Sequence, residues 1–156
     1  MSGILDLIPN YECQKTKEIK LVEIKVEYEG ELHSRAIHGP SQAVLQTDAP
    51  VDNQGRGEAF SPTDLLAASL GTCMLTVMGI LAKRQGWSLE GARAQVRKHM
   101  VESPERRVGR LEVELSFPVG IPESARPLLL RAADTCPVKQ SLHSAIEIEV
   151  QDHWDA

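Results

Sequence analysis

Two cysteines, Cys73 and Cys136, are the residues of this chain whose type and setting are best suited to covalent chemistry. Cys73 lies in the apolar run GTCMLTVMG, where the structural alternative is a small hydrophobe that fills the core. Ser69 and Thr76 lie four residues before it and three after it, on the same side of a helix, and could offer hydroxyls to a thiolate. The local sequence leaves both interpretations open.

Cys136 lies in Thr135-Cys136-Pro137-Val138-Lys139, which has the form of a helix start with proline at the first helical position. A thiol there meets unpaired backbone N–H groups and a partial positive charge, and Lys139 follows one turn later. All three favour the thiolate, so we expect the acidity of Cys136 to be raised. The alternative is an incidental cysteine in a turn.

A contact between the two cysteines, which are 63 residues apart, would define a reaction. A thiolate attacks the O–O bond of a peroxide to give a sulfenic acid, and the second thiol condenses with it to a disulfide. For turnover, a dithiol from outside the protein must reduce this disulfide by thiol–disulfide exchange at the more exposed sulfur.

Four charged residues, Glu58, Asp64, Arg56 and Arg35, could stand near the Cys73 segment. For each of them an ordinary solvated or capping role is the simpler interpretation.

Other nucleophilic chemistry has weaker support. No GxSxG elbow occurs, which argues against a serine hydrolase. His143 is near Cys136 in sequence, so an acyl-transfer enzyme built on a Cys/His pair stays open.

The elements that must position these residues follow from hydrophobic periodicity. Strands are predicted over residues 18–28, in LHSRAI and in QAVLQTD, as a β-meander, and a loop is predicted over 49–59. Ser61-Pro62 starts a helix that ends near Gly86 and is apolar nearly all round, which predicts burial on most of its faces.

The second half of the chain predicts a hairpin, a helix and a last strand. The hairpin strands are expected over 90–101 and 111–117, the helix from 121 to an interruption at Cys136-Pro137, and the strand over 145–150. The predicted class is α+β, with an antiparallel sheet packed on a central buried helix and a second helix.

Length and composition indicate one domain over residues 18–156, preceded by an N-terminal arm, 1–17. The net charge of −5 without a basic block argues against nucleic acid as a partner. The three cysteines, Cys13 included, match neither a zinc motif nor a disulfide framework. With no signal peptide and no apolar run that approaches a membrane span, we expect a cytoplasmic protein without a membrane partner.

Taken together, the segments FSPTDLLAASLGTCMLTVM and DTCPVKQSL resemble the OsmC/Ohr family of thiol peroxidases, over about residues 20–150. The resemblance implies an intertwined homodimer with each active site at the subunit interface. It also implies reduction of organic hydroperoxides by a peroxidatic Cys73 with Cys136 as the resolving cysteine, and hydrogen peroxide is the second candidate substrate. The reductant would be a small dithiol or a lipoyl-type protein, and no cofactor or metal is expected.

One departure from the family pattern concerns the residue after the helix-initiating proline. The organic-hydroperoxide branch has a glutamate there, paired with an arginine of the N-terminal strands, whereas this chain has Thr63 followed by Asp64. Arg35 is the loosely placed candidate for that arginine. The sequence is more similar to the OsmC-like branch, whose helix reads Pro-x-Glu/Asp-Leu-Leu.

Two hypotheses follow from the sequence. The first is a dimeric thiol-dependent peroxidase with Cys73 as nucleophile, Cys136 as resolver, and Asp64, Glu58 and Arg35 as possible supporting residues. The second is a non-catalytic protein of the same fold that binds, or senses by redox chemistry, a small apolar or electrophilic ligand.

Overall fold

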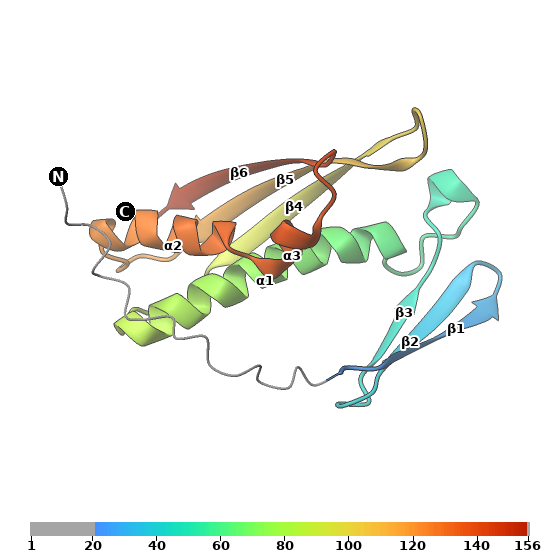
Figure 1. The fold of residues 1–156 in the computed structure, drawn as a ribbon, viewed down its shortest axis with the longest axis horizontal. Helices are drawn as coiled ribbons and strands as arrows, with labels where there is room; N and C mark the ends of the chain where they lie inside the picture. The colour runs from blue at the N-terminus through green and yellow to red at the C-terminus, as the bar shows by residue number, and fades with distance from the viewer. Residues whose placement is uncertain (1–20, 156) are drawn as a thin grey trace. The chain divides into compact units, whose positions relative to one another are not determined.

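The computed structural model describes residues 21–155 of the chain, which divides into two compact units, Met1–Gln46 and Thr47–Ala156 (Figure 1). The expected N-terminal arm, 1–17, and Cys13 lie outside the described residues. The division falls inside the domain expected over 18–156, and the expectation of a single domain stays a prediction.

The N-terminal unit contributes a three-stranded sheet in the order β1-β2-β3. Its strands are β1 (Ile24–Gly30), β2 (His33–His38) and β3 (Val44–Thr47). β1 and β2 are antiparallel, with Val26 opposite Ala36, and the chain reverses between them at Glu31 and Leu32, which both have positive φ. The predicted meander matches this sheet.

The strand predicted over 18–28 as half-buried differs from β1 in two respects. Its regular part begins at Ile24, and its apolar side chains are exposed, with 66% of Val26 accessible. Alternation of apolar and polar residues fixes which face a side chain occupies, but not whether another element covers that face.

The C-terminal unit has a sheet in the order β4-β5-β6 with helices on it. Its elements are a short 3-10 helix (Val51–Asn53), α1 (Pro62–Gln85), β4 (Arg93–Val101), β5 (Arg107–Phe117), a 3-10 turn (Glu123–Ala125), α2 (Arg126–Asp134), α3 (Pro137–Ser141) and β6 (Glu147–Trp154). The predicted α+β class is therefore confirmed.

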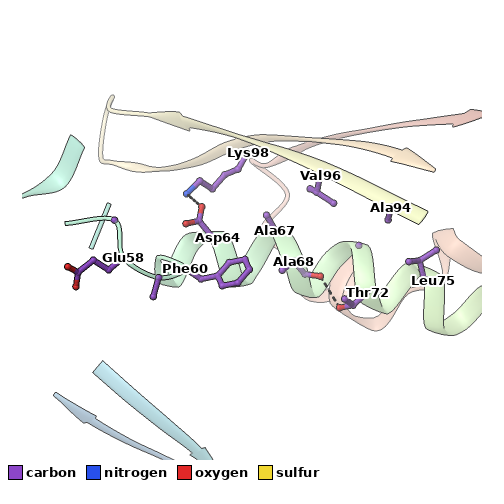
Figure 2. Close-up of a pocket in the computed structure, with 13 residues that line it drawn as sticks. Glu58, Phe60, Asp64, Ala67, Ala68, Thr72, Leu75, Ala94, Val96 and Lys98 are labelled. Atoms are coloured by element: carbon purple, nitrogen blue, oxygen red, sulfur yellow. Dashed lines mark hydrogen bonds and ion pairs between the residues drawn. The ribbon is translucent and has the colours of Figure 1, made fainter. Parts of the chain in front are cut away.

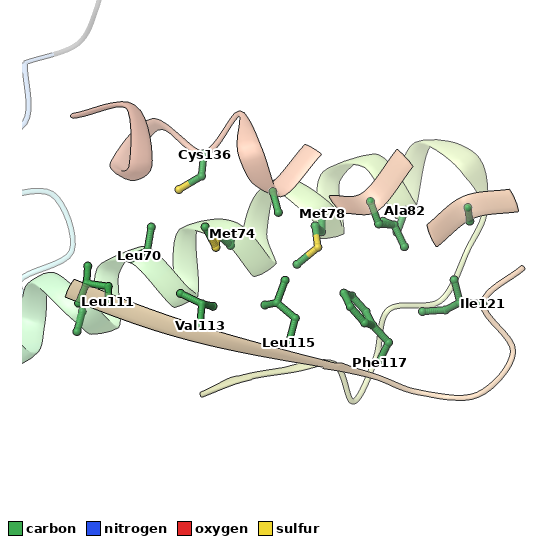
Figure 3. Packing of buried hydrophobic residues seen from close by; sticks show 14 of the residues in the cluster. Leu70, Met74, Met78, Ala82, Leu111, Val113, Leu115, Phe117, Ile121 and Cys136 are labelled. Atoms are coloured by element: carbon green, nitrogen blue, oxygen red, sulfur yellow. The ribbon is translucent and has the colours of Figure 1, made fainter. Parts of the chain in front are cut away.

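The core of this unit lies between β5 and the helices. Leu111, Val113, Leu115 and Phe117 of β5 point toward α1 and α2, where they meet Leu70, Met74 and Met78 (Figure 3). These three α1 residues are fully buried and recur every three to four positions, so one stripe of the helix faces the core. The expectation that α1 is buried on most faces is wrong for this unit, because Thr72 and Thr76 are exposed and Ile80 is 49% accessible.

The last strand, β6, corrects the expectation of a purely antiparallel sheet. β4 and β5 form the predicted antiparallel hairpin, with Val96 opposite Val113, but β6 pairs parallel to β5, with Val113 opposite Val150. The chain leaves β5, crosses the sheet through α2 and α3, and re-enters at the end where β5 began (Figure 1). A helical crossover of this kind joins parallel neighbours.

The expectation that no apolar run approaches the length of a membrane span is also wrong. Among the described residues, α1 is long and apolar enough to cross a membrane, by length and composition alone. A helix that packs on a sheet as a core element passes the same test.

Candidate active site

The helix that carries Cys73 is fixed at its N-terminus by a complete capping box. The Asp64 N–H donates to Ser61 Oγ at 3.1 Å, and Asp64 Oδ2 accepts from the Ser61 N–H at 2.8 Å. With Pro62 in the first turn, these bonds explain why the helix starts where the sequence predicted. Cys73 lies near the middle of α1 and is half-buried at the edge of the core.

Cys136 is the N-cap residue of the short helix α3. Its side chain is fully buried, and its Sγ accepts the backbone N–H of Lys139 at 3.5 Å. Figure 3 shows the sulfur directed from α3 toward α1. The helix-start interpretation of Thr135-Cys136-Pro137 is therefore correct, and the cysteine belongs to the core rather than to an exposed turn.

The fold brings Cys73 on α1 and Cys136 at the start of α3 near enough for the Cys73 thiol to influence the pKa of Cys136. Burial is the largest influence on Cys136 and raises its pKa, and the neighbouring Cys73 thiol raises it further. The Lys139 N–H acts in the opposite direction but does not prevail.

The expectation that the acidity of Cys136 is raised is therefore wrong. The ammonium of Lys139 pairs with Asp134 at 2.7 Å. The N-terminus of α3 lowers the pKa of Cys136, but burial of the sulfur away from solvent raises that pKa by more.

Two hydroxyls expected to support Cys73 are engaged with the main chain. Ser69 Oγ donates to the Leu66 carbonyl at 2.7 Å and Thr76 Oγ1 donates to the Thr72 carbonyl at 2.8 Å. Hydroxyls within helices commonly make such bonds to the preceding turn.

An apolar groove of about 490 Å³ lies between the first turns of α1 and α3. Leu65, Leu66 and Ser69 line it from α1, Val138 lines it from α3, and Leu142 lines it from the end of α3. The lining includes Ser69, one helical turn before Cys73, and Val138, two residues after Cys136, but neither cysteine itself. Its lining suits a hydrocarbon group better than a charged one.

A second cavity, of about 800 Å³, lies on the opposite face of α1 (Figure 2). Ala68, Gly71 and Leu75 of α1 form one wall, Ala94 and Val96 of β4 another, and Glu58, Asp64 and Lys98 lie toward one end. Asp64 and Cys73 are nine residues apart, two and a half turns, which puts them on opposite sides of the helix. The supporting roles predicted for Asp64 and Glu58 therefore lack direct contact with Cys73.

Lys98 is the polar residue of this cavity that sequence reasoning missed. Its Nζ donates to Asp64 Oδ1 at 2.6 Å and to Thr63 Oγ1 at 2.8 Å, and its side chain is only 15% accessible. Burial alone raises the pKa of Asp64, but hydrogen bonds from Lys98 and Ser61 outweigh it and hold the pKa below its ordinary value. The alternation in β4 could have revealed this role, because Lys98 lies on the same face of the strand as the apolar residues Ala94 and Val96.

Thr63 and Asp64 thus meet a lysine from β4. Arg35, the loosely placed candidate for the family's arginine, lies on β2 of the N-terminal unit, where it pairs with Glu27 at 2.5 Å and Glu29 at 3.1 Å. A supporting role for Arg35 stays a prediction. Arg56 donates its backbone N–H to Asp48 in the loop before α1.

His143 does not form a Cys/His pair in the described part of the chain. Its Nδ1 accepts the backbone N–H of Ala145 at 3.0 Å, its side chain is exposed, and no hydrogen bond joins it to either thiol among residues 21–155. This geometry disfavours the acyl-transfer alternative.

Comparisons with known proteins agree with this fold. The OsmC family, described as OsmC-like protein, matches residues 55–151. A protein from Psychrobacter arcticus, named for osmotic stress induction and a detoxification response, is 45% identical with a TM-score of 0.79, over 83% of this chain and 94% of that one.

More distant structures share the fold. The organic hydroperoxide resistance protein OsmC of Legionella pneumophila is 20% identical with a TM-score of 0.67, over 87% of this chain and 98% of that one. An OsmC-like protein of Mycoplasma pneumoniae is 16% identical with a TM-score of 0.74, again over 87% and 98%. The comparison with curated proteins gave no match.

Proposed function

Because the chain belongs to the OsmC-like protein family, we propose that it is a thiol-dependent peroxidase that reduces organic hydroperoxides through Cys73 and Cys136. The observation that carries the proposal is the proximity of a half-buried Cys73 to a fully buried Cys136, whose pKa the neighbouring thiol raises. The name of the Legionella relative, an organic hydroperoxide resistance protein, supports the same chemistry.

The surroundings of the two thiols indicate which is the nucleophile and which is the resolving cysteine. Cys136 keeps its proton because burial raises its pKa, so Cys73, which a substrate reaches more easily, is the nucleophile. The Cys73 thiolate attacks the terminal oxygen of ROOH, the O–O bond breaks, and the alkoxide leaves as ROH after taking a proton. Cys73 is left as a sulfenic acid.

Resolution uses the neighbouring thiol, because Cys136 is near enough to Cys73 for the two side chains to interact. Cys136 attacks the Cys73 sulfur, a disulfide forms, and the hydroxyl leaves as water with the Cys136 proton. A dithiol then returns both cysteines to thiols and becomes a disulfide itself. This cycle requires no metal and no organic cofactor.

The apolar groove between α1 and α3 supports the preference for an organic hydroperoxide. Its leucine and valine side chains can hold the hydrocarbon part of ROOH with the peroxide toward Cys73. The physiological assembly we propose is a homodimer in the cytoplasm, served by a small dithiol or a lipoyl-type protein.

The test is the rate at which the purified protein consumes cumene hydroperoxide and hydrogen peroxide with a dithiol. Cys73→Ser should abolish turnover. Cys136→Ser should allow a first oxidation but stop cycling, while Cys13→Ser, the matched cysteine control, should match the wild type. Wild-type protein without turnover on either peroxide would favour the alternative, a non-catalytic binding or redox-sensing protein.

A further inference from the structure

We propose that the reducing dithiol attacks the sulfur of Cys73 in the Cys73–Cys136 disulfide, with Cys136 as the leaving thiolate. The inference rests on the proposed function and specifies the step at which the reductant enters. Either sulfur of a disulfide can be attacked, so the choice depends on access and on the leaving group.

Access differs sharply between the two cysteines. Cys136 has no accessible surface and belongs to the buried core cluster, whereas Cys73 is half-buried and only packs against that cluster. A thiolate must approach along the S–S axis from the side away from the leaving sulfur. For attack on Cys136 that approach runs through the packed segment around α3.

The groove provides the approach to Cys73. It is lined on α1 by Leu66 and Ser69, and Ser69 lies one turn before Cys73 on the same side of the helix. A reductant with a slim hydrocarbon body fits this groove, and its sulfur then lies about one helical turn from Cys73 at the Ser69 end.

The pKa of the leaving thiol disfavours attack on Cys73. Cys136 would be the leaving thiol, and a thiol of raised pKa leaves more slowly. Two features limit this cost. The Lys139 N–H already donates to Cys136 Sγ and remains available to the departing thiolate. Attack on Cys136 would have to reach a side chain without accessible surface, whereas Cys73 is partly exposed.

The dithiol reduces the Cys73–Cys136 disulfide in two successive thiol–disulfide exchanges. The first thiolate of the dithiol bonds to Cys73, the S–S bond breaks, and Cys136 departs as a thiolate that takes up a proton. The second thiol of the reductant then attacks its own mixed-disulfide sulfur, which releases the Cys73 thiolate and an oxidised, cyclic reductant.

The test traps the mixed disulfide in the wild-type protein. The disulfide is formed with diamide, a chemical oxidant that makes the result independent of peroxidase activity. It is then exposed briefly to the monothiol 2-mercaptoethanol, quenched in acid, alkylated with N-ethylmaleimide and digested with trypsin. Cleavage after Arg56, Lys83, Arg131 and Lys139 puts the two cysteines on separate peptides, 57–83 and 132–139.

At the shortest times the monothiol should lie on Cys73 and the maleimide on Cys136. Predominant or equal labelling of Cys136 by the monothiol would overturn the inference, as would failure of diamide to link the two cysteines. A protein that shows the expected labelling but consumes no hydroperoxide would contradict the proposed function and leave the site of attack intact.

Discussion

Single residues of this chain differ from their sequence-based interpretation mainly where distant elements of the fold bury them. Cys136 has the sequence of an activated thiol, yet its pKa is raised because the side chain is withdrawn from water. Lys98 has the sequence of a surface lysine, yet it is largely buried and donates to Thr63 and Asp64 at the start of α1. In both cases the neighbours that matter come from distant parts of the chain.

Asp64→Ala should lower the free energy of unfolding at pH 7 by about 1–2 kcal/mol, because it removes a capping carboxylate and the charged partner of Lys98. The pKa of Asp64 is lower in the folded protein than its ordinary value of 3.8, so this stability is present above that value. It is lost as the pH falls through the folded pKa. Urea unfolding at pH 7 and pH 3 checks both statements.

Two further variants separate charge from capping. Asp64→Asn keeps an acceptor for the Ser61 N–H, so its loss at pH 7 should be smaller than that of Asp64→Ala. Glu123→Gln, an exposed carboxylate outside the capping box, is the matched control and should change little at either pH. An Asp64→Ala deficit that stays constant down to pH 3 would contradict the ion-pair argument.

Among the elements, α1 and β4 approach each other closely because Gly71 has no side chain. A Cβ at Gly71 would lie 2.9 Å from Val96 Cγ2 and 3.4 Å from Ala94 Cβ. Gly79, two turns later on the same helix, has no atom within 4 Å of such a Cβ. The two glycines therefore offer a matched comparison of packing against helix propensity.

Gly71→Ala should destabilise the protein by about 1–3 kcal/mol, since the clash with a stiff valine exceeds the gain in helix propensity. Gly79→Ala should stabilise it by about 0.5–1 kcal/mol through propensity alone. Thermal unfolding of both variants measures the difference. Equal stabilisation by the two substitutions would show that the helix and the strand are not in close contact at Gly71, and Val96→Ala should relieve the Gly71→Ala defect.

At the scale of the whole molecule, the described part of the N-terminal unit leaves an apolar sheet face uncovered. Ile24, Val26 and Tyr28 alternate along β1 on one face and are 59%, 66% and 68% accessible. Apolar patches of this kind mark surfaces that associate. This apolar face of β1 supports the proposal of a homodimer, in which a second copy of the chain covers it.

Val26→Glu should raise the concentration at which the dimer dissociates by at least about tenfold, because a charge would be buried in the interface. Lys25→Glu, on the opposite face of the same strand, is the matched control and should have little effect. Sedimentation velocity over a concentration series measures both. A wild-type mass of 17.2 kDa at tens of micromolar, or equal behaviour of the two variants, would contradict the proposal.

The sequence by itself determined the local features of this protein. The capping box at Ser61, the hairpin of β4 and β5, the N-cap position of Cys136 and the family motifs all depend on residues a few positions apart, and short-range periodicity records them. The candidate pair, Cys73 and Cys136, was identified at this level.

Only the tertiary structure decided what depends on distant packing. It brings together two thiols that are 63 residues apart, runs β6 parallel to β5 through a helical crossover, and puts Lys98 against the start of α1. It also reverses the expected acidity of Cys136, since desolvation depends on which elements enclose a sulfur. Local sequence does not encode that enclosure, because the atoms that exclude water from Cys136 belong to other elements of the fold.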